Sequence, residues 1–374
     1  MEAACKRRLA ARIAAAGGAL RFDHFMAFAL YDPECGYYTC KPTVLGSAGD
    51  FTTASEMSPI FAATLARGIA PQLAALERPR IVEFGAGSGR FAAALLHALG
   101  HLDQLPERYV ICDVSPRLAA LQQAFLREAV AELPVTVTFE SASDCTPAPG
   151  VLVANEVLDA LPVRRFVCRS AGLAEQWVVA EGAGVALRER PLARGLAERL
   201  RTRYGACWDD LEEGSEVEIN ARMLAFLRTL KRVNPGGAIW LSDYGEPRTA
   251  YYHAGRTRGT LLCHRNHEIS HDPLTHIGQQ DITASVDFTR VAEVASAHGL
   301  EVRGFATQAH ALVTLGVDSV VAGLSEDARL DAVAALKTLL LPGQMGERVK
   351  LMVLAAPELA YTPLFDPFDM RHRL

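Results

Sequence analysis

The 374-residue sequence lacks the features that mark several protein classes. Its eight cysteines form no C-x-x-C pair, which argues against a zinc ribbon or a disulfide framework and favours free thiols in a reducing compartment. No apolar run approaches the ~18 residues of a membrane span, so we expect none. The sequence has 38 basic and 43 acidic residues, so it lacks the excess of positive charge that binds a nucleic-acid backbone, and we expect no nucleic-acid partner.

Signatures of hydrolysis and metal binding are also missing. The G-x-S-x-G elbow of serine hydrolases does not occur. His264, His267, His271 and His276 are clustered, but Cys263 is the one cysteine near them, so we predict a surface or substrate loop and no metal site. The basic start, followed by an Ala-rich stretch broken by glycines, favours an amphipathic helix over a signal peptide. A mitochondrial presequence is the weaker alternative, and we expect a cytoplasmic protein.

The middle of the chain alternates short apolar runs with amphipathic segments, which predicts βαβ units around a parallel sheet. Buried parallel strands are largely apolar, as most of these runs are. We therefore predict an α/β protein with a mixed, mostly parallel, doubly wound sheet. The expected strands are 81–82, 109–112, 135–139, 151–154, 238–242, 302–306 and 350–354.

The segments around this core differ in pattern. Residues 1–75 are expected to be a mainly helical N-terminal lid, and residues 76–355 the core. Residues 163–220 form an expected insertion with a hairpin and an Arg-rich helix, residues 244–285 a long loop, and residues 356–374 a tail.

The segment E-F-G-A-G-S-G-R joins a predicted strand to a predicted helix. Glycines at such a turn let a ligand lie against the backbone, and the helix N-terminus offers free N–H groups. A dinucleotide fingerprint needs a glycine at position 90, where Arg90 stands. The spacing of Glu83, Gly85, Gly87 and Gly89 instead resembles S-adenosylmethionine (SAM) binding in class I methyltransferases. A glycine turn without a ligand is the alternative.

Carboxylates follow the second and fourth predicted strands. Asp113 can accept hydrogen bonds from both hydroxyls of an adenosyl ribose, or it can serve the approach to the next helix. Asn155, Glu156 and Asp159 follow the fourth strand, where open α/β sheets have their ligand crevice. Two carboxylates and an amide can clamp a guanidinium, although Asp159 can equally cap a helix.

Six motifs together resemble the MidA-like methyltransferases, bacterial relatives of a mitochondrial complex I assembly factor. They are D-P-E-C-G-Y-Y (32–38), G-D-F-T-T-A-S-E (49–56), N-E-V-L-D-A-L-P (155–162), D-Y-G (243–245), G-T-L (259–261) and G-Q-Q-D-I-T (278–283). The resemblance covers residues 20–355. It implies a Rossmann-like class I fold, SAM as cofactor, and methylation of arginine in a partner protein, with a respiratory complex subunit as one candidate. The family often has Glu where Asp113 stands.

This reading assigns roles to the candidate residues. Glu156 orients the guanidinium, Asn155 helps to hold the acceptor, and Asp159 or Asp243 accepts the departing proton. Glu83 holds the methionine amino group of the cofactor, and Asp113 the ribose. In the N-terminal motif, Phe51 or Tyr38 faces the sulfonium, and Thr52 and Thr53 bond the methionine moiety, unless this segment simply packs on the sheet edge. The alternatives are a SAM-binding assembly chaperone without catalysis and a small-molecule methyltransferase; oligomerisation is open.

Overall fold

The computed structural model describes residues 2–41, 54–182, 184–359 and 364–374. Its main feature is an eight-stranded sheet in the order β15-β16-β10-β5-β2-β3-β4, with β14 paired to β10. From β10 to β4 the path is parallel, whereas β16 is antiparallel to both β10 and β15. The predicted mixed, mostly parallel sheet is confirmed. Its strands are β2 (Arg80–Phe84), β3 (Arg108–Cys112), β4 (Thr136–Glu140), β5 (Val151–Asn155), β10 (Ala238–Glu246), β14 (Val286–Asp287), β15 (Glu301–Thr307) and β16 (Val349–Ala355).

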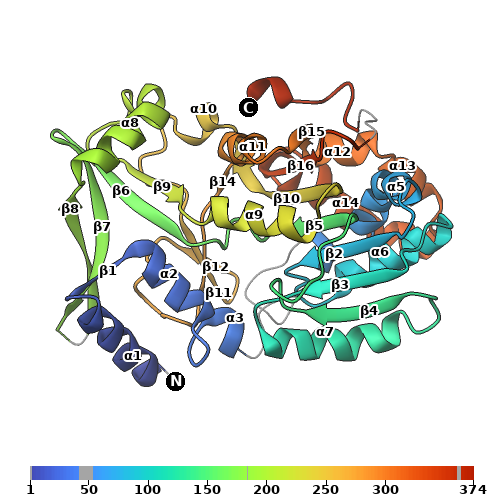
Figure 1. The fold of residues 1–374 in the computed structure, drawn as a ribbon, viewed down its shortest axis with the longest axis horizontal. Helices are drawn as coiled ribbons and strands as arrows, with labels where there is room; N and C mark the ends of the chain where they lie inside the picture. The colour runs from blue at the N-terminus through green and yellow to red at the C-terminus, as the bar shows by residue number, and fades with distance from the viewer. Residues whose placement is uncertain (1, 42–53, 183, 360–363) are drawn as a thin grey trace.

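Helices cover both faces of this sheet (Figure 1). Successive side chains of a strand point to opposite faces, so Ile81 joins one buried cluster and Val82 the other. Each face thus has its own apolar core. The first face holds α5 (Ile60–Ala74), α6 (Arg90–His101), α7 (Pro116–Ala129), α12 (Gln308–Thr314), α13 (Val317–Ala322), α14 (Glu326–Leu340) and α15 (Met345–Arg348). The second holds α9 (Met223–Val233) and α11 (Phe288–Ala297).

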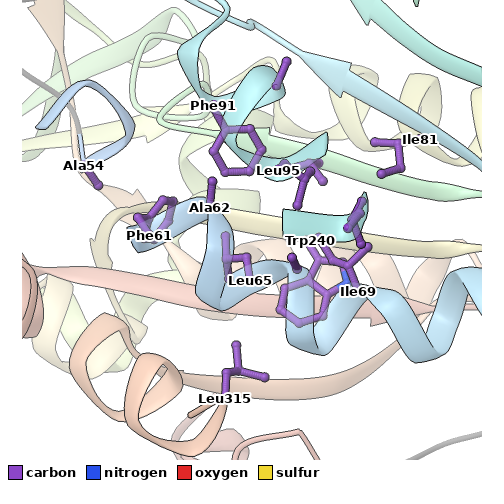
Figure 2. Close-up of a cluster of buried hydrophobic side chains, with 14 of the residues drawn as sticks. Ala54, Phe61, Ala62, Leu65, Ile69, Ile81, Phe91, Leu95, Trp240 and Leu315 are labelled. Atoms are coloured by element: carbon purple, nitrogen blue, oxygen red, sulfur yellow. The ribbon is translucent and has the colours of Figure 1, made fainter. Parts of the chain in front are cut away.

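Helix α5 lies unusually close to the sheet. Leu65 and Ile69 of this helix lie beside Trp240 of β10 in the cluster shown in Figure 2. A Cβ atom at Gly68 would lie 2.6 Å from the Trp240 ring, so only glycine fits at the crossing. The Trp240 indole donates a hydrogen bond to Gln72 Oε1 over 2.8 Å, which satisfies its buried N–H.

A second, antiparallel sheet joins the N-terminal region to the insertion. Its order is β1-β7-β6-β9, with β8 on β7, and it lies at the left of Figure 1. The predicted hairpin is present as β6 and β7, and the Arg-rich helix as α8. The strand β1 comes from far earlier in the chain and pairs with β7. The elements are α1 (Glu2–Ala15), β1 (Ala19–Arg21), α2 (Phe22–Tyr31), β6 (Val163–Arg169), β7 (Gly172–Glu181), β8 (Gly184–Pro191), α8 (Arg194–Trp208) and β9 (Glu216–Asn220).

The prediction of a long loop over 244–285 was wrong. This segment contains α10 (Arg248–Tyr251) and a three-stranded sheet, β12-β11-β13, made of β11 (Leu262–Arg265), β12 (Glu268–Ser270) and β13 (Asp281–Thr283). These strands have three or four residues and mix charged with apolar side chains. They are too short for an alternating hydrophobic pattern to predict them from the sequence. The remaining elements are α3 (Tyr37–Cys40), α4 (Ala54–Met57) and a 3₁₀ turn at Arg371–Arg373.

Candidate active site

The glycine turn between β2 and α6 forms the base of the site. Gly85, Gly87 and Gly89 all have positive φ, at 69°, 57° and 87°, where other L-residues are strained. A Cβ atom at Gly85 would lie 2.8 Å from a Val157 methyl group, so the turn is pressed against the chain that follows β5. Gly89 is the N-cap of α6. The turn therefore exposes backbone N–H groups to a ligand on its open side.

A cavity of about 430 Å³ opens at the carboxyl ends of β2, β3 and β5. Of the predicted site residues, its walls bring together Glu83, Gly85, Gly87, Asp113, Asn155 and Glu156. Gly89 does not line it. Phe51, Thr52 and Thr53 lie outside the described residues. This position is where doubly wound sheets bind their ligands.

Two hydrogen-bond donors hold Asp113, one from α7 and one from the residue that precedes this helix. Its Oδ1 accepts the Ser115 backbone N–H at 2.9 Å, and its Oδ2 accepts the Gln122 amide at 2.9 Å. The same Gln122 amide donates to the Gly87 carbonyl at 3.0 Å, so it links the carboxylate to the glycine turn. Helical periodicity groups Leu121 and Phe125 on one apolar face of α7 and gives no reason for Gln122 to be buried. Both are exposed, whereas Gln122 and Leu126 are buried.

Glu83 is a buried carboxylate in the cavity wall. Its Oε2 accepts a hydrogen bond from the Tyr109 hydroxyl of β3 at 2.8 Å. Burial raises the pKa of Glu83 to about 8, and the charge of Asp113 adds to the rise, whereas the Tyr109 hydrogen bond opposes it. A cationic ligand group beside Glu83 would favour its ionised form, so such a group would bind with release of a proton at neutral pH.

Glu56 was not among the predicted residues, yet it also lines the cavity. It belongs to the short helix α4 and bonds the Ser88 hydroxyl of the glycine turn. Its other oxygen lies 3.5 Å from Arg90 Nε. The motif G-D-F-T-T-A-S-E contains this residue, so a signal for it was present in the sequence.

Glu156 follows β5 with a φ of 53°, a left-handed conformation that is uncommon for glutamate. Its backbone N–H donates to the Ser242 carbonyl at 2.7 Å, and its Oε1 accepts the Ala54 N–H at 3.2 Å and the Asn155 amide at 3.4 Å. Burial, followed by the charge of Asp159, raises the pKa of Glu156 to about 8. Strain of this kind persists only where the surrounding contacts hold it.

Asp243 supplies those contacts. Its Oδ2 accepts the backbone N–H groups of Val157, Leu158 and Asp159 at 3.0, 2.7 and 3.3 Å. Its Oδ1 accepts the N–H of Tyr244 at 2.8 Å. Asp243 is fully buried and does not line the cavity, so its carboxylate acts on the backbone after β5. It holds the chain after β5 and so positions Glu156.

A second cavity, of about 440 Å³, shares Glu156 and Tyr38 with the first. Asp159, Asp281, Tyr244 and Glu246 are among its walls. The Tyr38 hydroxyl donates to Asp281 Oδ1 at 2.9 Å, across 243 residues of sequence. The two cavities therefore meet at one carboxylate and one phenol.

The N-terminal region reaches both cavities through a pair of tyrosines. Tyr31 of α2 lines the first cavity and stacks on Tyr38 of α3, with ring centroids 5.6 Å apart. Its hydroxyl donates to the Ala160 carbonyl at 2.9 Å. Tyr38 was predicted to approach the cofactor, but Tyr31 and Asp281 were not predicted. Both lie in or beside family-like motifs, which is the signal that sequence reasoning had available.

Within the described ranges, no helix has the length and apolar character that crossing a membrane requires. No group of three or more His, Cys, Asp or Glu side chains suited to a metal ion occurs among these residues. His264 of the histidine cluster lines the second cavity instead.

Comparisons with known proteins agree with this geometry. Residues 64–306 match the family described as "Putative S-adenosyl-L-methionine-dependent methyltransferase". A Burkholderia thailandensis protein, described as a "likely methyl transferase" and crystallised with S-adenosyl-homocysteine, is 36% identical with a TM-score of 0.92. The alignment covers 99% of this chain and 96% of that one.

More distant relatives are mitochondrial. The mouse protein named "Protein arginine methyltransferase NDUFAF7, mitochondrial" is 28% identical over 380 residues, covering 90% of this chain and 81% of the relative. The zebrafish protein of the same name is 26% identical over 373 residues, with 91% and 84% covered. The family match spans more than half of the chain and includes the glycine turn. The chain therefore belongs to this family of S-adenosyl-L-methionine-dependent methyltransferases.

Proposed function

We propose that the protein transfers a methyl group from SAM to a side-chain nitrogen of arginine in a partner protein. The observation that carries the proposal is the position of Glu156, a carboxylate common to two adjoining cavities. Among the described residues it forms no ion pair with a basic side chain, so it is available to a cation. The relatives named as protein arginine methyltransferases support arginine as the acceptor.

The cavity at the glycine turn suits the cofactor. Gly85 and Gly87 line it, and because glycine has no side chain a ligand can lie close to the backbone of the turn. Glu83 and Asp113 offer carboxylates to an ammonium group and to ribose hydroxyls, respectively. The cavity volume lies within the ~300–1,000 Å³ typical of small-molecule sites. When bound, SAM supplies an electrophilic methyl group on a sulfonium sulfur.

The protein's own residues position the acceptor. In the net reaction, one N–H of arginine becomes N–CH₃, the sulfonium becomes the neutral thioether of S-adenosylhomocysteine, and one proton leaves. Glu156 accepts hydrogen bonds from the guanidinium and sets its orientation, while Asp243 holds the chain that carries Glu156. Asp159, in the wall of the second cavity, is the proposed proton acceptor. Holding both reactants in line lowers the entropic part of the barrier.

The test is methyl transfer from radiolabelled SAM to lysate proteins of the source cell, followed by mass-spectrometric location of the label. We expect methylarginine in one or a few proteins, with a respiratory complex subunit as the first candidate to examine. Glu156→Gln should abolish transfer while SAM still binds. Label on another residue type, or unchanged turnover in Glu156→Gln, would contradict the proposal.

The size of the second cavity favours one alternative, a small-molecule acceptor. Its volume also lies in the range typical of small ligands. In the same assay, a small-molecule acceptor would put the label in the protein-free fraction. A SAM-binding assembly chaperone would bind SAM and leave both fractions unlabelled.

The proposed location is the cytoplasm. The support is the scatter of eight unbridged cysteines along the chain, five of them buried. Fractionation of the source cell followed by immunoblotting tests it, and recovery of the protein in a membrane or exported fraction would contradict it.

A further inference from the structure

We infer that the second cavity is the acceptor site and that Asp281, held by Tyr38, binds the positive charge of the arginine side chain. This inference rests on the proposed function, because it names the part of the protein that selects the acceptor. The cofactor cavity alone does not determine where the acceptor binds.

The first argument is the connection between the cavities. Glu156 and Tyr38 line both of them, so a side chain in the second cavity meets the carboxylate that also faces the first. The second cavity lies between the end of β10 and the small sheet β12-β11-β13. Its walls are therefore separate from the glycine turn that suits the cofactor.

The second argument is charge. Four carboxylates line the cavity: Glu156, Asp159, Glu246 and Asp281. Glu246 is neutralised by Lys350, whose Nζ lies 2.9 Å away. Asp159 is nine-tenths buried, and among the described residues no side chain pairs with it. A buried carboxylate without a cation is costly, and an entering guanidinium would remove that cost.

The acids of the cavity also affect one another. The pKa of Asp159 is raised well above its usual value, first by burial and then by the charges of Asp243 and Asp281. Burial, together with the charge of Asp159, likewise raises the pKa of Glu156. A cation between these groups favours their ionised forms, so it binds with release of protons.

Positive and other titratable groups are found in the same walls. Arg348 of α15 is exposed, and Arg256 is partly exposed and donates to the Tyr251 carbonyl at 2.9 Å. Charges near solvent are screened, whereas Asp159 and Asp281 are buried. The described walls also contain the phenols of Tyr38 and Tyr244 and the imidazole of His264. Within the part of the chain that the structure describes, the buried charged side chains of these walls, Asp159 and Asp281, are both acidic.

Tyr38 fixes the geometry of Asp281. Its hydroxyl and the Ile282 backbone N–H, at 2.9 Å each, both donate to Asp281 Oδ1. This oxygen is thereby oriented by groups from α3 and β13, which belong to different parts of the chain. A carboxylate fixed in this way binds a guanidinium with little loss of its own side-chain entropy.

The experiment is calorimetric titration of the protein, loaded with S-adenosylhomocysteine, with the peptide acetyl-Gly-Arg-Gly-amide. The matched ligand is the citrulline peptide, which has nearly the shape of the arginine peptide and no charge. We expect the arginine peptide to bind at least about tenfold more tightly and to release protons, seen as a dependence of heat on the buffer. Equal binding of the two peptides, or no arginine binding at about 10 mM, would overturn the inference.

The matched protein variants are Asp281→Asn and Glu268→Gln. Each removes one carboxylate charge, but Glu268 is exposed on β12 and does not line the cavity. Asp281→Asn should weaken arginine binding about 30-fold or more, and Glu268→Gln should leave it unchanged. Unchanged binding in Asp281→Asn would overturn the role of Asp281. Unchanged affinity for S-adenosylhomocysteine shows that Asp281→Asn is folded. If Asp281→Asn does not fold, Asp159→Asn is used in its place and should likewise weaken binding of the arginine peptide.

This experiment separates the two proposals. Methylarginine formation without selective peptide binding would leave the proposed function in place and refute the acceptor site. Selective binding of the arginine peptide without methyl transfer to any protein would leave the arginine-binding site in place and refute the proposed function.

Discussion

Gly85→Ala tests whether the contact between the glycine turn and the chain after β5 controls cofactor binding. The new methyl carbon would start 2.8 Å from a Val157 methyl group, whereas ordinary contacts begin at 3.4 Å. Relief of such overlap in a packed site costs about 1–3 kcal/mol. The left-handed backbone, with φ of 69°, adds about 1–2 kcal/mol for any residue with a Cβ. We therefore expect a loss of roughly 2–5 kcal/mol.

A matched control separates the two costs. Gly343 has a φ of 75°, and a Cβ there would meet nothing within 4 Å, so Gly343→Ala carries the backbone strain without the overlap. Urea unfolding should show the larger loss in Gly85→Ala. Calorimetry with S-adenosylhomocysteine should show at least about tenfold weaker binding in Gly85→Ala and none of this effect in Gly343→Ala.

The double variant Gly85→Ala with Val157→Ala completes the test. Removal of the Val157 methyl groups takes away the overlap and leaves the strain, so binding should recover in part. If the double variant binds no better than Gly85→Ala, or if Gly343→Ala loses as much affinity, the reasoning from this contact is wrong.

Two further predictions concern the buried acids. The pKa values of Glu83 and Glu156 are raised from 4.5 to about 8, so their stabilising contribution is full below about pH 4.5 and lost as pH rises through about 8. Urea unfolding of the ligand-free protein should therefore show that it is less stable at about pH 9 than at about pH 6, by roughly 3 kcal/mol per group. Glu83→Gln should reduce that difference, and a flat profile would contradict the assignment. Tyr109→Phe removes the hydroxyl that donates to Glu83 over 2.8 Å. The change should cost about 1–3 kcal/mol of stability and weaken SAM binding. Unchanged unfolding and calorimetric curves would show that this hydrogen bond contributes nothing.

The sequence predicted the core because its signals are local. The strand β2 is an apolar run followed at once by the glycine turn. Ser115 is a typical N-cap residue followed by proline, and it caps α7 by accepting the Leu118 N–H. These features need only neighbouring residues. The same local signals brought Glu83, Asp113 and Glu156 to one cavity.

What failed to be predicted depends on distant partners. Gln122 is buried because it joins Asp113 to the Gly87 carbonyl, and no helical periodicity contains that requirement. The bond between Tyr38 and Asp281 crosses 243 residues. The strand β1 has three residues and exists through its pairing with β7, so its sequence alone does not specify it.

The pairing of β1 with β7 also sets an order of events during synthesis. Phe22, Phe25 and Phe28 of α2 are fully buried in a cluster that includes Val163 and Val178. Val163 leaves the ribosome 163 − 28 = 135 residues after Phe28. At about 5–20 residues per second, these phenylalanines wait roughly 7–27 seconds for their partners. The helix that carries Tyr31 to the cofactor cavity is thus made early and docks late, with its apolar face open to chaperones meanwhile.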